Sequence, residues 1–386
     1  TAGGSRAGCS LTSVSGGVFI GRHAGRYATT ASNSTFVGHN AGQGITGVKL
    51  TGDNNTAIGK DAGLLLQGAA ANNTLVGKSC GDALTVGNDN TAVGRDALTA
   101  DTKGGSTVAI GDGALSTQNF TSATDVFNVA VGRLAGEANA TGTSNTFIGG
   151  LAGRNVTGSS NTAVGAAAMD AAVSGTQNTA VGVNALGAAN GAANNNTAVG
   201  VQAGASVTTG DNNLLLGLDA GQTGSPGGAI TTASNEIGLG DENISAANIQ
   251  VDWTVASDQR DKTDFTDLDL GLDFVKALAP VTYKWDKRSK YGDKYADDYD
   301  LNAQTPDGTH KEDWLDIGFK AQEVQALEEA AGYTTAAKKN LTVSTSDDGK
   351  QYGLQYSKFV PILVKAIQEQ NALIEALTAR IETLEG

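Results

Sequence analysis

A nine-residue pattern of small apolar and polar positions recurs through the first two thirds of this chain. The unit reads Asn-Thr-Ala-Val/Ile-Gly-x-x-Ala-Gly/Leu, as in NTAIGKDAG from Asn55, NTAVGRDAL from Asn90 and NTAVGVQAG from Asn196. Measured from Gly21 to Gly238, the central glycines are spaced by 17, 21, 18, 17, 17, 21, 17, 16, 17, 18, 17 and 21 residues. The period is therefore 17, with insertions of four residues in polar stretches that we interpret as loops at one corner of a coil.

Within each unit the apolar and polar positions alternate with a period of two, which predicts a short β-strand with one buried face. The glycine after Val or Ile allows a turn or the close approach of a neighbouring backbone. The leading asparagine suits a turn, and stacked asparagines can form side-chain ladders. A coil this small must bury its core by stacking, so we expect a mainly β fold: a solenoid, or β-roll, of about 12–13 coils.

Composition agrees with thin, stacked β-structure. Glycine accounts for 53 residues and proline for 4, while aromatic residues are 5% of the chain. Because Ala is the main apolar residue of the repeats, we expect a poor core in one chain and more surface buried when identical chains associate. The repeats, at roughly residues 15–240, resemble the heads of trimeric autotransporter adhesins, although the repeat of that family is shorter.

Charge and isolated residues exclude several classes of function. The net charge of −14 comes with no cluster of Lys or Arg, which argues against nucleic acid and anionic membranes as partners. No apolar run is long enough to span a membrane, so we expect no membrane insertion. We expect no cofactor and no metal, and we interpret His23 and His39 as surface residues. Cys9 and Cys80 are expected to be free thiols, and the start at Thr1 suggests a fragment or a processed product.

The repeat ends near residue 245, and a sequence of ordinary globular composition follows. At this junction Ser257 stands five residues before Lys262, in the run Ser-Asp-Gln-Arg-Asp-Lys. A Ser-Lys dyad is a known variant of the catalytic triad, in which the amine activates the hydroxyl. The local sequence also fits an ordinary helix N-cap with surface cations. Arg260 would either lower the pKa of Lys262 or bind carboxylates to fix the backbone.

The C-terminus carries a heptad pattern. Alternating d and a positions, starting from d, are occupied by Leu363, Ile367, Gln370, Ile374, Leu377, Ile381 and Leu384. This predicts a coiled coil over residues 360–385. Ile at a with Leu at d would by itself favour two strands, and the polar Gln370 would set the register.

Three segments resemble the C-terminal intramolecular chaperone of phage endosialidases, tail spikes and neck appendages, a self-cleaving serine peptidase family. They are Trp253 followed by Ser257, Asp258, Arg260 and Lys262; GFKAQEVQ from Gly318; and the Tyr-rich entry into the terminal helix. The resemblance covers residues 246–386. It implies a trimer, a small α+β domain, and a Ser257 that attacks the carbonyl of Ala256 with Lys262 as base and Asp258 and Arg260 in support.

We therefore divide the chain into a repetitive fibre or head (residues 1–245), a linker (246–256) and a chaperone and autocleavage domain (257–386). The predicted protein is a phage tail fibre or spike, a homotrimer in the virion that is assembled in the host cytoplasm. Its expected partners are a host cell-surface receptor, preferably a glycan, and tail proteins at the N-terminal side. The alternatives are a bacterial trimeric adhesin with a permanent trimerisation cap, and a glycan depolymerase spike.

Overall fold

A computed structural model describes the chain except for residues 172–173, 190, 297 and 335–340. It divides into two compact units, unit 1 (Thr1–Asp241) and unit 2 (Glu242–Gly386), and each is described by itself.

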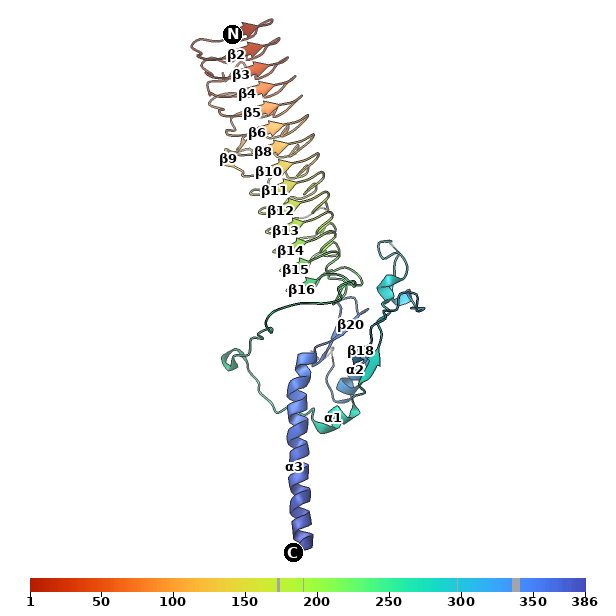
Figure 1. The fold of residues 1–386 in the computed structure, drawn as a ribbon. Coiled ribbons are helices and arrows are strands. Elements are labelled where there is room, and N and C mark those ends of the chain that lie inside the picture. Colours follow the sequence, from red (N-terminus) through yellow and green to blue (C-terminus); the bar gives the residue numbers. More distant parts are fainter. Residues whose placement is uncertain (172–173, 190, 297, 335–340) are drawn as a thin grey trace. The chain divides into compact units, whose positions relative to one another are not determined.

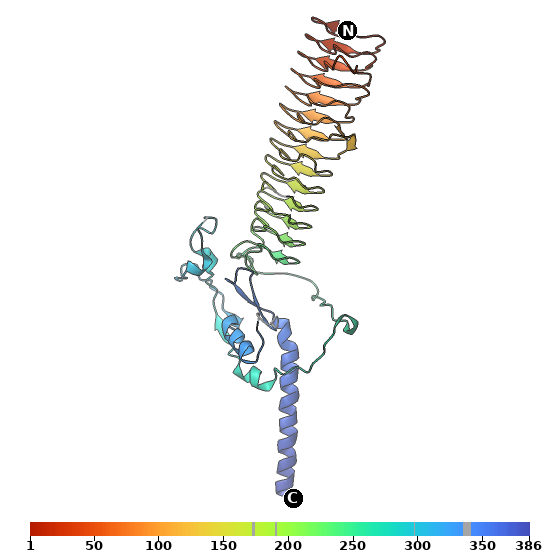
Figure 2. The ribbon, with the colours of Figure 1, turned by 180° about the vertical axis from the view of Figure 1, so that it is seen from behind.

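Unit 1 is a parallel β-solenoid of about 12 turns, as the repeat predicts (Figure 1). Its strands stack in one 14-stranded sheet, and each strand pairs in register with the same positions of the next coil (Figure 2). The strands of this sheet are β1 (Ala2–Gly3), β2 (Val18–Ile20), β3 (Thr35–Val37), β4 (Thr56–Ile58), β5 (Thr74–Val76), β6 (Thr91–Val93), β8 (Val108–Ile110), β10 (Val129–Val131), β11 (Thr146–Ile148), β12 (Thr162–Val164), β13 (Thr179–Val181), β14 (Thr197–Val199), β15 (Leu214–Leu216) and β16 (Ile237–Leu239). Two further short strands, β7 (Gly104–Gly105) and β9 (Thr124–Asp125), form a separate parallel pair outside this sheet.

The middle residue of each strand points into the solenoid. This position holds Ala in most coils and Phe or Leu in others, such as Phe36, Ala92 and Phe147, all with no exposed surface. The interior of one chain is thus closed by its own residues, so the expectation of a poor core was wrong. The space inside a coil is narrow, and small side chains fill it.

The Val, Ile or Leu at the third position of each three-residue strand of this sheet points outward. These residues form a continuous file along the sheet, which we call the outer row, and they are exposed or half-buried. The outer row consists of Ile20, Val37, Ile58, Val76, Val93, Ile110, Val131, Ile148, Val164, Val181, Val199, Leu216 and Leu239. Parallel sheets are usually covered on both faces, whereas in one chain this face is open.

The predicted asparagine ladder is present and buried. In each step the side-chain oxygen of one Asn accepts the backbone N–H of the next, as from Asn178 to Asn161 (3.0 Å). The side-chain amide donates to a carbonyl at the coil's corner, as from Asn161 to Gly175 (3.0 Å). One coil has Thr107 at this position, and the buried Gln118 supplies the missing amide by donating to the Thr107 hydroxyl.

The central glycines from Gly21 to Gly217 have the conformation that the sequence predicts, whereas Gly238 lies in the middle of β16 and Gly240 takes the corner position of that coil. Gly182 has φ of 139°, and a Cβ there would lie 2.3 Å from the carbonyl oxygen of Gly200 in the next coil. Any side chain would therefore collide with the neighbouring backbone, because coils stack at strand spacing at this corner.

Unit 2 is a small α+β region that ends in a long helix. Its elements are η1 (Gln259–Asp261), α1 (Leu272–Ala277), β17 (Val281–Tyr283), η2 (Arg288–Lys290), η3 (Leu301–Ala303), β18 (Asp316–Gly318), α2 (Ala321–Ala330), β19 (Val343–Thr345), β20 (Tyr352–Leu354), η4 (Tyr356–Lys358) and α3 (Phe359–Glu385). The pairs β17–β18 and β19–β20 are antiparallel. No helix among the described residues is long and apolar enough to cross a bilayer.

The core of unit 2 forms where α1, α2 and the first turns of α3 meet. Phe274, Val324, Phe359 and Ile362 are buried there together. A buried carboxylate braces the same region: Glu328 accepts hydrogen bonds from the backbone and the hydroxyl of Thr342. The N-terminal part of α3 is thereby attached to its own domain through one face.

Candidate functional site

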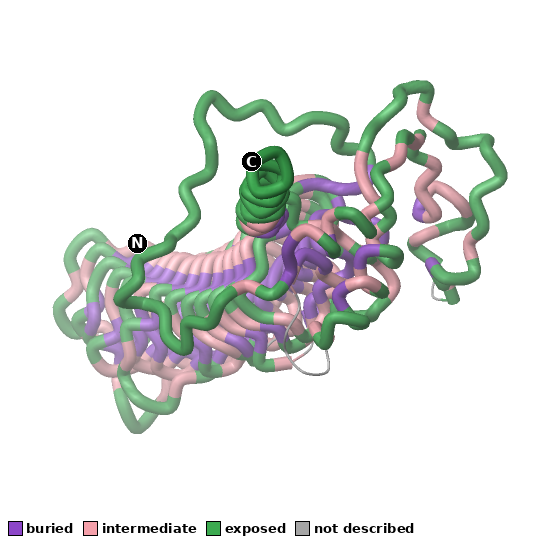
Figure 3. The backbone as a smooth tube through the Cα atoms, turned by 90° about the horizontal axis from the view of Figure 1, so that it is seen from below, coloured by how far each residue is buried: buried purple, intermediate pink, exposed green. Residues whose placement is uncertain are grey.

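The candidate site lies on an extended segment in the N-terminal part of unit 2. After β16 the chain runs without regular structure to η1, and residues 243–267 are exposed (Figure 3). The Ala256–Ser257 bond is in this segment, two residues before the single turn of η1.

The turn of η1 is capped by Asp258, whose carboxylate accepts the backbone N–H of Arg260 at 2.9 Å. The Arg260 guanidinium also contacts this carboxylate, with Nη2 to Oδ2 at 2.6 Å. The Arg260 side chain and then its backbone N–H lower the pKa of Asp258, and the pair raises the pKa of Arg260. An N-cap is therefore present, but Asp258 provides it. Arg260 binds a carboxylate, which is one of the two roles that the sequence leaves open.

The same turn brings the two candidate catalytic side chains together. Lys262 Nζ lies 2.6 Å from Ser257 Oγ, although the residues are five positions apart. This is hydrogen-bond distance, the first requirement for a base that takes the hydroxyl proton. Both side chains are exposed in one chain. An amine accepts a proton only when it is neutral, and burial or nearby cations favour the neutral form.

The carbonyl of Ala256 has no hydrogen-bond donor among the described residues. No N–H or hydroxyl of the chain donates to the oxygen of Ala256 there. Acyl transfer normally needs donors placed at this oxygen, because negative charge develops on it. One chain thus brings a candidate nucleophile and a candidate base together, and its described residues form no oxyanion hole at Ala256.

The predicted heptad positions lie on one helix, α3, and face solvent. Leu363, Ile367, Gln370, Ile374, Leu377, Ile381 and Leu384 are all exposed in the single chain. The residues of α3 that pack on the domain are instead Phe359, Ile362 and Ala366, on a different face. The helix consequently has two apolar faces near its start, and one of them is unpaired.

The sequence did not predict two contacts that stabilise unit 2. Glu369 on α3 accepts the backbone N–H of Leu272 at 2.7 Å, at the start of α1. Glu242, the first residue of unit 2, forms a buried ion pair with Lys294 at 2.8 Å. The paired residues are 97 and 52 positions apart, and no local pattern connects them.

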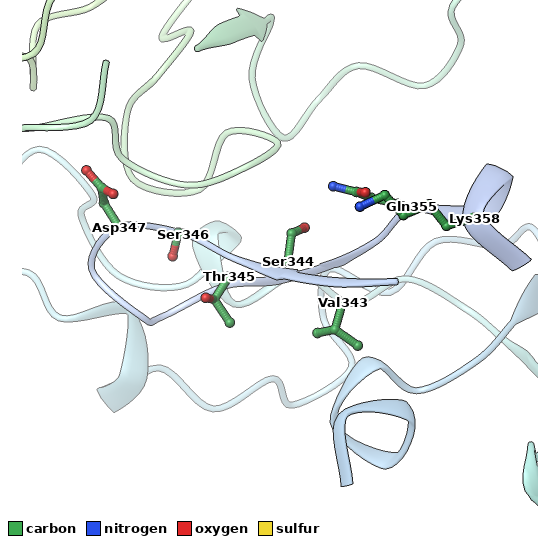
Figure 4. A pocket seen from close by; sticks show the side chains of 7 residues that line it. All are labelled: Val343, Ser344, Thr345, Ser346, Asp347, Gln355 and Lys358. Carbon is green, nitrogen blue, oxygen red and sulfur yellow. The ribbon is translucent and has the colours of Figure 1, made fainter. Parts of the chain in front are cut away.

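A shallow hollow follows the hairpin of β19 and β20, and the labelled side chains of Val343 and Ser344 point to opposite sides of the strand there (Figure 4). In the described part of the chain, no three His, Cys, Asp or Glu side chains are grouped to bind a metal ion. Cys9 and Cys80 are both free thiols.

Comparison with known proteins gives one match. Residues 257–333 match the family described as "Chaperone of endosialidase". The match begins at Ser257 and covers the part of unit 2 from η1 to α2. No curated protein and no solved structure matches the chain.

Proposed function

Because the C-terminal region of this chain is a chaperone-of-endosialidase domain, we propose that the protein is a phage tail fibre or spike that cleaves itself between Ala256 and Ser257. The domain brings three chains together, guides folding of the solenoid and then leaves it. The observation that carries the proposal is the contact of Lys262 Nζ with Ser257 Oγ at the first residue of the family match.

The chemistry follows from the two side chains. Lys262, as the neutral amine, takes the proton from Ser257 Oγ, and the oxygen attacks the carbonyl carbon of Ala256. The new C–O bond forms as the Ala256–Ser257 C–N bond breaks, and Lys262 returns the proton to the leaving nitrogen. Water then hydrolyses the ester, which leaves a carboxylate on Ala256 and a free amine on Ser257. Nucleophile and target belong to one chain, so proximity supplies much of the rate.

The exposed state of the dyad supports cleavage after assembly. In one chain both side chains face solvent, and the carbonyl of Ala256 lacks a donor among the described residues. Contact with neighbouring copies would exclude water, favour neutral Lys262 and supply donors. The domain would then remain attached until it has aligned the chains.

Two exposed apolar surfaces support association of identical chains. One is the heptad face of α3, and the other is the outer row of the solenoid. Apolar surfaces of this length seldom stay in contact with water in a monomer. Pairing three helices first would align the solenoids, whose register is otherwise a slow, non-local search. After cleavage the fibre would be kinetically trapped.

The proposed partners of this protein are a receptor on the host surface, preferably a glycan, and tail proteins at the N-terminal side. It places the protein in the virion after assembly in the host cytoplasm. A bacterial adhesin with a permanent cap is the alternative if the bond stays intact, and a depolymerase is the alternative if the solenoid degrades a glycan.

The test is intact mass and denaturing electrophoresis of freshly expressed chain, with four variants. We expect wild type to yield fragments 1–256 and 257–386, and Ser257→Ala and Lys262→Ala to remain whole. Lys262→Arg keeps a cation in place but provides no base, so it should also remain whole. Lys276→Ala, which removes an exposed lysine of α1, should cleave as wild type. Intact wild-type trimer would refute self-cleavage and leave the domain as a permanent cap.

A further inference from the structure

The segment before the cleavage site has the pattern of a β-strand, although it is not in a sheet. Residues 249–255 read Ile-Gln-Val-Asp-Trp-Thr-Val, with apolar side chains at every second position. The apolar positions are Ile249, Val251, Trp253 and Val255, and we call them the apolar file. This alternation is typical of a strand with one buried face.

In a single chain the apolar file has nothing to cover it. Val251 and Trp253 are each 75% exposed and Val255 is 76% exposed. From residue 244 to 256, no backbone hydrogen bond to another part of the chain forms among the described residues. A file of exposed apolar side chains that includes a Trp is typical of an interaction surface.

We propose that this partner is the same segment in the other two copies. Residues 249–255 of three chains lie parallel, and their apolar files face one another around the common axis. This inference rests on the trimer proposed above and gives the segment a role that the division into fibre, linker and chaperone does not give it.

Chain order favours identical copies as the occupant. In chain order the segment lies between the outer row, which ends at Leu239, and the heptad face of α3, which begins at Leu363, and both are exposed apolar surfaces of the same chain. A parallel bundle of α3 helices holds equal residues of the copies at equal heights around one axis. Each segment 249–255 is then beside its own duplicates.

The polar positions set the register. Gln250, Asp252 and Thr254 alternate with the apolar file and would face water in this arrangement. A slip of one residue would turn every side chain to the opposite face and place three copies of Asp252 on the axis. Because like carboxylates repel and lose water there, only the stated arrangement is favourable.

The position of the file also determines where it goes after cleavage. Val255 is two residues before Ser257, so the whole file stays on the fibre when the bond breaks. It would hold the new C-termini together after the α3 helices have gone.

The first test is cross-linking of single cysteines in a Cys9→Ser background, which removes the exposed native thiol. A short bismaleimide should link Val251→Cys between chains at least tenfold more than the matched neighbour Asp252→Cys. The linked product should lie in fragment 1–256. Leu377→Cys on α3 reports the trimer itself. If it links while positions 251 and 252 link equally, the strand proposal is wrong. If it does not link, the trimer proposal fails first.

The second test uses the native Trp253 as the site of proteolysis. Chymotrypsin cuts after exposed aromatic residues in extended chain, and Trp253 has both features in one copy. In the assembled protein we expect the bond after Trp253 to be at least tenfold more resistant than in Val251→Asp. Rapid cleavage at Trp253 in an intact wild-type trimer would overturn the proposal.

Discussion

The asparagine ladder predicts a large loss of stability from one small change, Asn161→Ala. Asn161 is fully buried, and its backbone is not in the left-handed region, so Ala fits the local conformation. Its Oδ1 accepts the backbone N–H of Asn178, and its Nδ2 donates to the carbonyl of Gly175. Removing the amide leaves two buried backbone groups without partners.

Each orphaned buried group costs about 1–3 kcal/mol, so the change should cost about 2–6 kcal/mol. At about 2–4 °C per kcal/mol for a domain of this size, the apparent melting temperature should fall by roughly 4–24 °C. Thr107 supports the argument, because the one coil with Thr in this file has a buried Gln118 to replace the amide.

The assay is thermal unfolding by circular dichroism at one fixed chain concentration, because assembly makes the midpoint concentration-dependent. The matched control is Asn119→Ala, which loses one exposed hydrogen bond from Thr102. If the midpoints of Asn161→Ala and Asn119→Ala agree within about 1 °C, the ladder does not stabilise the fold as described.

Four further predictions concern three residues, Cys80, Gly182 and Glu369. Burial raises the pKa of the Cys80 thiol to about 12. A water-soluble maleimide at pH 8 should therefore label Cys9 in the folded protein and Cys80 only after unfolding, as measured by mass spectrometry. Equal labelling of the two thiols in the folded state would contradict the burial of Cys80. Between pH 9.0 and 12 the unfolded chain releases this proton and the folded chain keeps it, so stability should fall by up to about 1.4 kcal/mol per pH unit, and denaturant unfolding of Cys80→Ala should lack that slope. Gly182→Ala should lower the melting temperature by several degrees, because its Cβ collides with the next coil, and an unchanged midpoint would refute the close approach. Glu369→Ala removes the acceptor for the first amide of α1 and should cost about 1–2 kcal/mol, whereas Glu375→Ala on the exposed part of α3 should be neutral in the same unfolding assay.

The solenoid could be predicted because its contacts repeat along the chain. Each ladder Asn bonds to the residue about 17 positions later, so the period is visible in the letters themselves. The need for Gly182 and its equivalents follows from the same stacking. What the pattern did not reveal was which aliphatic residue faces inward, because Ala and Val are both apolar. Ala92 is buried and Val93 points outward. The width of the coil determines which of the two residues faces inward, and hydrophobicity alone does not indicate that width.

The sequence predicts that Ser257 and Lys262 act together, but it does not predict which residues surround them. The spacing of Ser257 and Lys262 suggested the dyad, and the turn of η1 brings their side chains within 2.6 Å. The support from Glu369 to Leu272 joins positions 97 apart, which no local periodicity encodes. The alternation of apolar and polar residues at 249–255 is visible in the sequence. Because this segment lies next to the junction, we interpreted it as part of a linker.

Because the coils of unit 1 stack in register, the length of the solenoid changes by whole coils. Because every coil offers the same edge to its neighbours, a deletion of residues 74–90 would join Asn73 to Thr91 and leave the ladder continuous. Each such step changes the length by about 4.8 Å, the spacing between strands. A gene that gains or loses one repeat thereby lengthens or shortens the solenoid by one coil, and the contacts between the remaining coils stay the same.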